Sequence, residues 1–141
     1  MSLEISVVLV CFDRGRFLRE TIDSILTQTF TDFELIICDD CSTDDTPEIC
    51  REYARRDKRI QYHRNPQNLG MPQNLNLGIE RSGGKYIANL HDGDIYSADL
   101  IELWHRCAIE YPTVGFVFNE YADLDEMGGI CRIERLDLKY V

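Results

Sequence analysis

The chain has 141 residues, 44% of them hydrophobic and 28% charged, as expected of one globular domain, or part of one, with a substantial core. Its formal net charge of −10 argues against a broad nucleic-acid-binding surface. No apolar run reaches the length of a membrane span, so we expect no transmembrane segment. The chain has six cysteines and no export signal, so we expect these thiols to be reduced and the protein to be cytoplasmic, peripheral to the membrane at most.

Strand and helix patterns alternate along the first part of the chain. Residues 4–12 are almost all apolar and rich in β-branched side chains, which predicts a strand buried on both faces of a sheet. Residues 16–29 carry apolar side chains at helical spacing. Residues 33–38 predict a second buried strand. A helix is predicted over residues 46–56, and the alternation of residues 59–64 predicts a strand near a sheet edge.

The alternation continues with a predicted helix over residues 72–81 and a buried strand that begins at Lys85. Ser97 is predicted to cap the next helix. Residues 114–118 predict a further strand, which the glycines at 128–129 separate from an extended segment. Such alternation indicates an α/β fold with a largely parallel sheet. We expect a ligand-binding α/β region over residues 1–118, and the start of a second, incomplete region over residues 119–141.

Acidic residues follow three of the predicted strands: Asp13, then Asp39 and Asp40, then Asp92 and Asp94. Parallel sheets bind ligands at the carboxyl ends of their strands, so these acids are expected to surround one crevice. In an extended backbone Asp92 and Asp94 would point the same way, and two adjacent carboxylates favour a divalent cation such as Mg²⁺ or Mn²⁺. The alternative for this segment is a polar turn, for which Asp-Gly is a common dipeptide.

Several motifs in this order resemble the N-terminal half of family 2 glycosyltransferases with the GT-A fold, a Rossmann-like, mostly parallel sheet flanked by helices. The resemblance covers roughly residues 4–118. The matching segments are ISVVLVCFDR (5–14), LRETIDSILTQTF (18–30), DFELIICDDCSTD (32–44), NLG (68–70 and 76–78), GKYI (84–87) and the acidic motif HDGD (91–94).

The resemblance implies a hexosyltransferase-type enzyme of cell-surface polysaccharide synthesis, with a nucleotide-sugar donor, often a UDP-sugar, and a carbohydrate or lipid-linked acceptor. Asp40 would accept a hydrogen bond from the base, and Asp92 and Asp94 would hold Mn²⁺ or Mg²⁺ on the diphosphate. The nucleotide-binding residues implied in this way are Val10, Cys11, Phe12, Asp13, Asp40, Asn76 and Asp92.

The chain departs from the family pattern at informative positions. The family usually has Tyr-Asn in place of Phe12 and Asp13, an arginine in place of Leu75, and Asp-x-Asp-Asp in place of residues 91–94. The catalytic base is expected beyond residue 141, in the acceptor half of the family, so none is named. A non-catalytic nucleotide-binding module, or a degenerate transferase, is therefore the alternative function.

Other features have ordinary explanations. The spacing of Cys38 and Cys41 would suit a redox or zinc site, but the sequence has no second pair of ligands at a suitable distance. His91 is either a third metal ligand or a hydrogen-bond partner of a neighbouring carboxylate.

Overall fold

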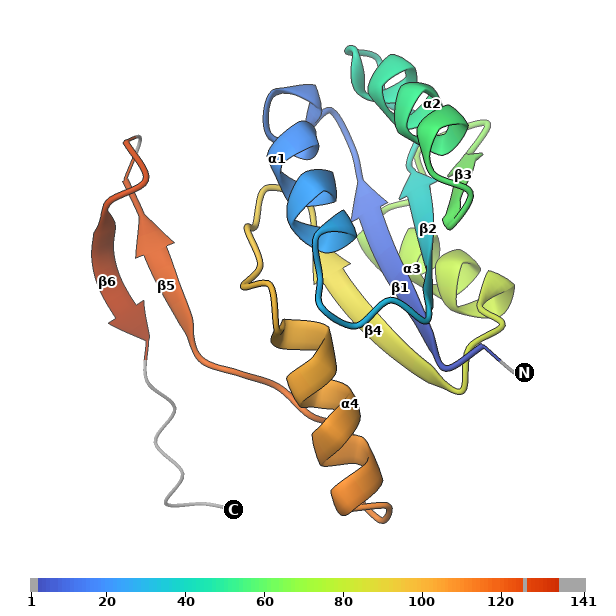
Figure 1. Cartoon of the computed structure of the whole chain (residues 1–141). Coiled ribbons are helices and arrows are strands. Elements are labelled where there is room, and N and C mark those ends of the chain that lie inside the picture. The colour runs from blue at the N-terminus through green and yellow to red at the C-terminus, as the bar shows by residue number, and fades with distance from the viewer. Residues whose placement is uncertain (1–2, 126, 135–141) are drawn as a thin grey trace. The chain divides into compact units, whose positions relative to one another are not determined.

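The computed structural model describes residues 3–125 and 127–134 (Figure 1). The chain divides after Glu102 into two compact units. In chain order the elements are β1 (Ile5–Cys11), α1 (Gly15–Leu26), β2 (Phe33–Asp39), α2 (Thr46–Arg56), β3 (Ile60–Arg64), α3 (Met71–Arg81), β4 (Tyr86–His91), α4 (Leu100–Glu110), β5 (Tyr121–Leu124) and β6 (Ile130–Glu134).

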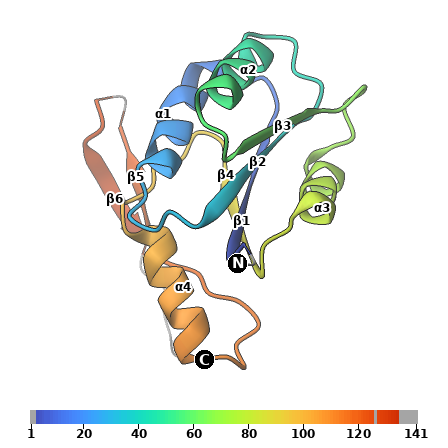
Figure 2. The same ribbon diagram turned by 45° about the vertical axis from the view of Figure 1, so that its right-hand side comes forward.

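The first unit is built on a four-stranded sheet with the order β3-β2-β1-β4, and all its strand pairs are parallel. Helices α1 and α2 lie on one face of this sheet and α3 lies on the other (Figure 2). The α/β fold with a parallel sheet is therefore confirmed, and β3 lies at the predicted edge.

Strand β1 is central because it has a strand on each side and helices over both faces. All seven of its residues are buried, as the unbroken apolar run predicts. Leu18, Ile22 and Ile25 of α1 are fully buried on one side of the sheet. On the other side α3 approaches very closely at Gly78, where an added Cβ would lie 2.4 Å from Cγ1 of Val8.

Strand β4 differs from the predicted buried strand. Ala88 and Leu90 are buried, but Ile87 is 44% exposed and the two remaining residues of that face, Asn89 and His91, are exposed as well. The exposed residues share the α3 side of the sheet, because they pair in register with Ser6, Val8 and Val10. Helix α3 packs over β1 and β2 and leaves this face of β4 uncovered in the first unit.

The second unit contains most of α4 and an antiparallel hairpin of β5 and β6. The glycines at 128–129 lie between β5 and β6, and Gly128 has a φ of 79°, which suits glycine. The strand predicted over residues 114–118 is not formed. A strand needs a hydrogen-bonding partner, and none of the described strands pairs with this segment, where Phe116 is 79% exposed.

No described helix has both the length and the apolar character that crossing a bilayer requires. The predicted boundary at residue 118 stays a prediction.

Candidate functional site

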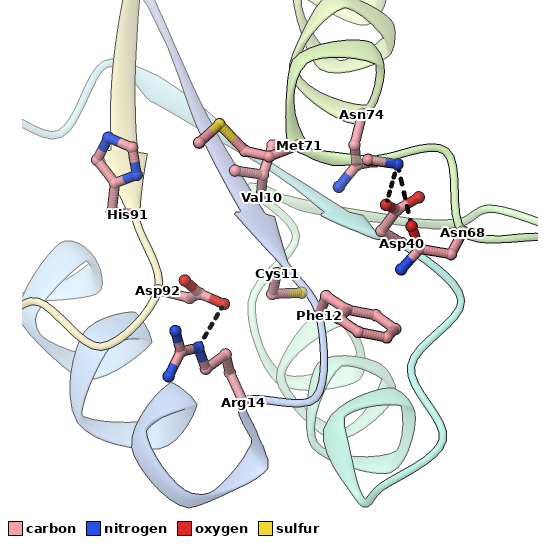
Figure 3. A pocket seen from close by; sticks show the side chains of 11 residues that line it. Val10, Cys11, Phe12, Arg14, Asp40, Asn68, Met71, Asn74, His91 and Asp92 are labelled. Carbon is pink, nitrogen blue, oxygen red and sulfur yellow. Dashed lines mark hydrogen bonds and ion pairs between the residues drawn. The ribbon is translucent and has the colours of Figure 1, made fainter.

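A cleft of about 530 Å³ opens in the first unit at the carboxyl ends of β1, β2 and β4 (Figure 3). The predicted crevice at these strand ends is therefore present, and Asp40 and Asp92 line it, whereas Asp13, Asp39 and Asp94 are not among its lining residues. The residues that line it are Val10, Cys11, Phe12, Arg14, Asp40, Asn68, Gly70, Met71, Asn74, His91 and Asp92.

The end of β1 forms one part of the cleft. Val10 and Cys11 are buried, whereas the Phe12 ring is 44% exposed. The predicted ligand residue Asp13 is not among the lining residues. It has a φ of 51°, and its Oδ1 accepts a 2.7 Å hydrogen bond from the N–H of Thr43. Asp13 therefore joins the turn after β1 to the loop after β2.

Asp40 is held by the segment between β3 and α3. Its Oδ1 accepts hydrogen bonds from Asn65 Nδ2 at 2.9 Å and from the N–H of Leu69 at 2.8 Å. Its Oδ2 accepts the N–H of Gly70 at 2.8 Å. A carboxylate offers about four acceptor positions, so these three bonds leave about one for a ligand. The side chain is only 3% exposed, and it fixes the wall of the cleft formed by the 65–70 loop.

The cleft is lined by the amides of Asn68 and Asn74, and not by the predicted Asn76. Asn74 is buried, receives a 2.9 Å hydrogen bond from Asn65 at its Oδ1, and donates through Nδ2 to the carbonyl of Cys38 at 2.7 Å. Asn76 is exposed, because two residues along a helix rotate a side chain by more than half a turn. The available signal was that Asn74 lies in the first turn of α3, beside the strand ends.

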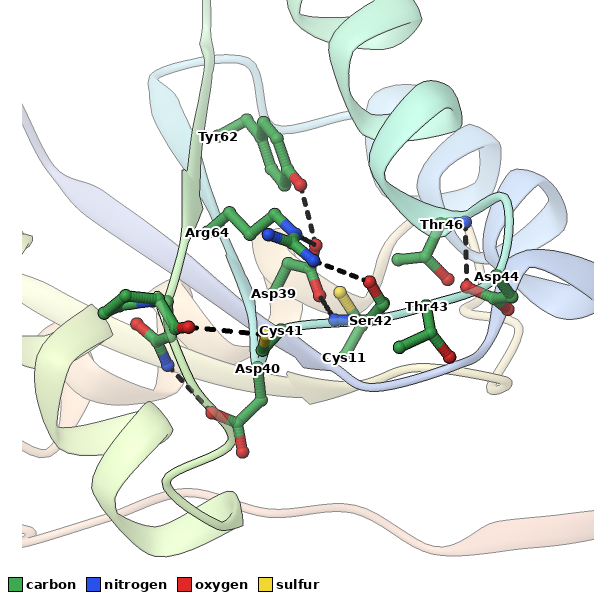
Figure 4. A network of polar contacts seen from close by, with 12 residues as sticks. Cys11, Asp39, Asp40, Cys41, Ser42, Thr43, Asp44, Thr46, Tyr62 and Arg64 are labelled. Carbon is green, nitrogen blue, oxygen red and sulfur yellow. Dashed lines mark hydrogen bonds and ion pairs between the residues drawn. The ribbon is translucent and has the colours of Figure 1, made fainter.

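Asp39, the neighbour of Asp40, is fully buried in a polar network (Figure 4). It accepts hydrogen bonds from the N–H of Ser42 at 2.8 Å and the hydroxyl of Tyr62 at 2.7 Å. Arg64 lies 3.5 Å from its Oδ2. Burial, together with Asp39, raises the pKa of Tyr62. Asp39 thus stabilises the loop after β2, and Asp40 is the member of the pair that reaches the cleft.

The Cys38 and Cys41 thiols are both free. Burial raises the pKa of Cys38 to about 11, the opposite of the lowered pKa that makes a thiol reactive. The structure therefore lends no support to a redox role for this pair.

The acidic turn after β4 separates the two predicted metal ligands. Asp92 lines the cleft, whereas Asp94 is not among the lining residues. The backbone is not extended here, because the strand ends at His91 and Gly93 has a φ of 93°. The Thr21 hydroxyl of α1 accepts the N–H of Gly93 at 3.0 Å and donates to the carbonyl of Asp94 at 2.9 Å.

Asp92 lies beside a cation in the cleft. Its Oδ2 lies 3.6 Å from Nε of Arg14 (Figure 3). Burial raises the pKa of Asp92 above its ordinary value, and the Arg14 guanidinium acts in the opposite direction. Arg14 was not predicted as a site residue, and its position directly after the carboxyl end of β1 was the available signal.

The described residues contain no group of three His, Cys, Asp or Glu side chains placed to hold a metal ion. Asp92 fits as a single carboxylate ligand, and a hard divalent ion bound there would take its other ligands from water or phosphate oxygens. Asp94 would have to turn toward the cleft to join it.

The parallel sheet with a cleft at its strand ends resembles the fold of solved glycosyltransferase structures. S. aureus TarS in complex with UDP matches it with a TM-score of 0.71 at 21% identity, over 77% of this chain and 33% of TarS. The mannosyltransferase PcManGT from Pyrobaculum calidifontis, in complex with GDP-Man and Mn²⁺, gives 0.69 at 17% identity, over 79% of this chain and 33% of that one. The fold is the GT-A fold of glycosyltransferases.

The particular family follows from the sequence. The model of glycosyl transferase family 2 matches residues 6–128, so the chain belongs to that family. The glycosyltransferase GlyG of Streptococcus pneumoniae is 33% identical over 129 residues, 92% of this chain and 42% of GlyG. The putative teichuronic acid biosynthesis glycosyltransferase TuaG of Bacillus subtilis is 29% identical over 128 residues, 86% of this chain and 51% of TuaG. The chain thus spans about half or less of the length of these relatives.

Proposed function

We propose that the chain forms the donor-binding part of a glycosyltransferase that moves a sugar from a UDP-sugar to a carbohydrate or lipid-linked acceptor. The observation that carries the proposal is the cleft at the ends of β1, β2 and β4, where Asp40 keeps about one acceptor position. A single free acceptor suits the imide N–H of uracil. Guanine would present two donors side by side on the corresponding edge.

The remaining cleft residues suit the other parts of such a donor. The partly exposed Phe12 ring offers an apolar face for the base, and Val10 and Cys11 lie beside it. Asp92 lies on the opposite side of the cleft, where the diphosphate would come close to the acidic turn (Figure 3). Support comes from the structural neighbours, since TarS has been crystallised with UDP and with UDP-GlcNAc.

Calorimetric titration with UDP, GDP and uridine tests the proposal. We expect UDP to bind more tightly than GDP, because of the single acceptor on Asp40, and more tightly than uridine, which lacks the diphosphate. Absence of binding by either nucleoside diphosphate at millimolar concentration would contradict the proposed function. Tighter binding of GDP would overturn the assignment of the base.

A divalent ion, Mn²⁺ or Mg²⁺, is part of the proposal. When bound, it would offset the negative charge that builds up on the departing nucleoside diphosphate. PcManGT, a neighbour in fold, was crystallised with Mn²⁺. Asp92 is the protein ligand in the cleft, and Asp94 is proposed to join it once the donor is bound.

Metal and nucleotide are expected to bind with positive coupling. Asp92 and Asp94 leave most of a coordination sphere to water, and a diphosphate supplies further anionic oxygens. We expect Mn²⁺ to raise UDP affinity about 5–150-fold relative to EDTA, and UDP to raise Mn²⁺ affinity by the same factor. Titrations of UDP in Mn²⁺ and in EDTA measure this directly, and equal affinities would remove the metal from the proposal.

Two matched variants assign the ligands. Asp92→Asn and Asp94→Asn each remove one charge and keep the shape of the side chain. We expect both to reduce the coupling. An unchanged coupling in Asp94→Asn would exclude Asp94 as a ligand.

A second candidate function is nucleotide-sugar binding without transfer. It is favoured by the position of Asp94, whose Oδ2 lies 3.5 Å from the Tyr96 hydroxyl and whose side chain does not line the cleft. Release of free sugar or transfer to an acceptor by the protein, measured with radiolabelled UDP-sugars, would exclude it.

A further inference from the structure

The cleft contains a single lysine or arginine side chain among its described lining residues, and this is Arg14. Two carboxylates, Asp40 and Asp92, line the same cleft. Asp40 accepts three hydrogen bonds from the 65–70 loop, and its remaining acceptor position is the one proposed for the base. The charge balance at the open end of the cleft is therefore set by Arg14 and Asp92.

The backbone of Arg14 is firmly placed. Its N–H donates to Oγ1 of Thr46 at 3.1 Å, and its carbonyl accepts the N–H groups of Phe17 and Leu18 in the first turn of α1 at 2.9 and 3.1 Å. The side chain therefore extends from a fixed point directly beside the end of β1.

The guanidinium itself is only loosely held. Its Nε lies 3.6 Å from Asp92, longer than the roughly 2.7–2.9 Å of a charge-assisted hydrogen bond. Within the described residues the guanidinium makes no hydrogen bond, and the Arg14 side chain is 52% exposed. Its donors are thus available to a ligand, and the fork of a guanidinium matches the oxygens of a phosphate.

We propose that Arg14 binds the diphosphate of the donor, and that it exchanges Asp92 for phosphate oxygens when the donor enters. This inference rests on the proposed function, since it concerns the same cleft. Without the exchange, a diphosphate would place further negative charge beside Asp92, and the described lining residues include no other lysine or arginine to balance it. The exchange also frees the Asp92 carboxylate at the moment when a metal ion bound to the diphosphate could use it.

The proposal predicts opposite effects of two substitutions when no metal is present. Arg14→Gln removes the phosphate partner and should weaken UDP binding about 10–100-fold in EDTA, while uridine affinity stays unchanged. Asp92→Asn removes the competing carboxylate and its repulsion, so it should strengthen UDP binding in EDTA. Arg14→Lys should restore part of the lost affinity, since it keeps the charge and loses the fork.

The matched control is Arg16→Gln, two residues further on, in the first turn of α1. Arg16 is exposed, lies over the Phe17 ring at 5.1 Å and does not line the cleft. The UDP affinity of the Arg16→Gln variant should therefore equal that of the unchanged protein. Thermal unfolding of each variant verifies that it is folded.

The outcomes separate the two proposals. If the unchanged protein binds UDP and Arg14→Gln binds it equally well, Arg14 does not contact the diphosphate, although the proposed function stands. A loss of metal-free UDP affinity in Asp92→Asn would overturn the exchange, because Asp92 would then contact the nucleotide directly. If the unchanged protein binds no nucleoside diphosphate, both proposals fall.

Discussion

Replacement of Asp40 by alanine is expected to lower the free energy of unfolding by about 3 kcal/mol and to weaken UDP binding in the same variant. The substitution removes the acceptor of Asn65 Nδ2 and of the N–H groups of Leu69 and Gly70. Donors that lose their acceptor away from water cost about 1–3 kcal/mol each, and partial access of water to this loop keeps the sum near the lower end. Urea denaturation measures the change in stability.

Hydrogen exchange distinguishes a loosened loop from a lost ligand contact. The Leu69 and Gly70 amides should exchange faster in Asp40→Ala. The amides of β1 should remain the more slowly exchanging ones, as in the unchanged protein. Asp45→Ala is the matched control, because Asp45 is exposed and its side chain makes no cap hydrogen bond. Unchanged stability, with the Leu69 and Gly70 amides still protected, would mean that Asp40 does not hold the loop.

Gly84→Ala is expected to destabilise the first unit by about 2–3 kcal/mol and to reduce UDP affinity. An added Cβ would lie 2.5 Å from the backbone N of Ser6 and 2.7 Å from the carbonyl carbon of Ile5. Backbone atoms of a central strand cannot move aside as a flexible side chain can. Strand β4 would therefore shift against β1, and Asp92 at its far end would move relative to Val10.

The adjacent Gly83 supplies the control. An added Cβ there would lie 3.5 Å from Oε1 of Glu34, an ordinary contact, so Gly83→Ala should change stability by less than about 0.5 kcal/mol. Equal unfolding midpoints for the two alanine variants would show that β4 tolerates displacement at this point.

Among the strands of the sheet, burial decides how closely the prediction from sequence matches the structure. Residues 5–11 and 33–39 are mostly apolar and almost all buried, and both strands formed within a residue or two of the predicted bounds. The 85–90 segment has an equally apolar appearance, but its burial depends on how far α3 reaches across the sheet. That distance is a tertiary property. The residues of the 114–118 segment favour a strand, but a strand forms only where a second strand is available to pair with it, and the propensity of a segment does not provide that second strand.

The cleft was located correctly from the acids that follow the strands, and its individual residues were harder to predict. Asn74 and Asn76 have the same side chain, and only the orientation of α3 about its own axis decides which one is buried. Asp94 was placed with Asp92 on the assumption of an extended backbone, which the positive φ of Gly93 breaks. Arg14 could be found only by knowing that the turn after β1 brings it opposite Asp92.

The cleft is assembled from segments that are far apart in sequence, from Val10 at the end of β1 to Asp92 after β4. Among the described strands, β4 pairs with β1 alone, so the cleft is complete only after this long-range contact has formed. The nucleotide proposed as the ligand would therefore bind the folded unit and not its partly folded states. At a concentration one hundred times its dissociation constant, such a ligand stabilises the native state by about 2.7 kcal/mol. Under the proposed function, the supply of donor in a cell would then influence how long the protein survives proteolysis.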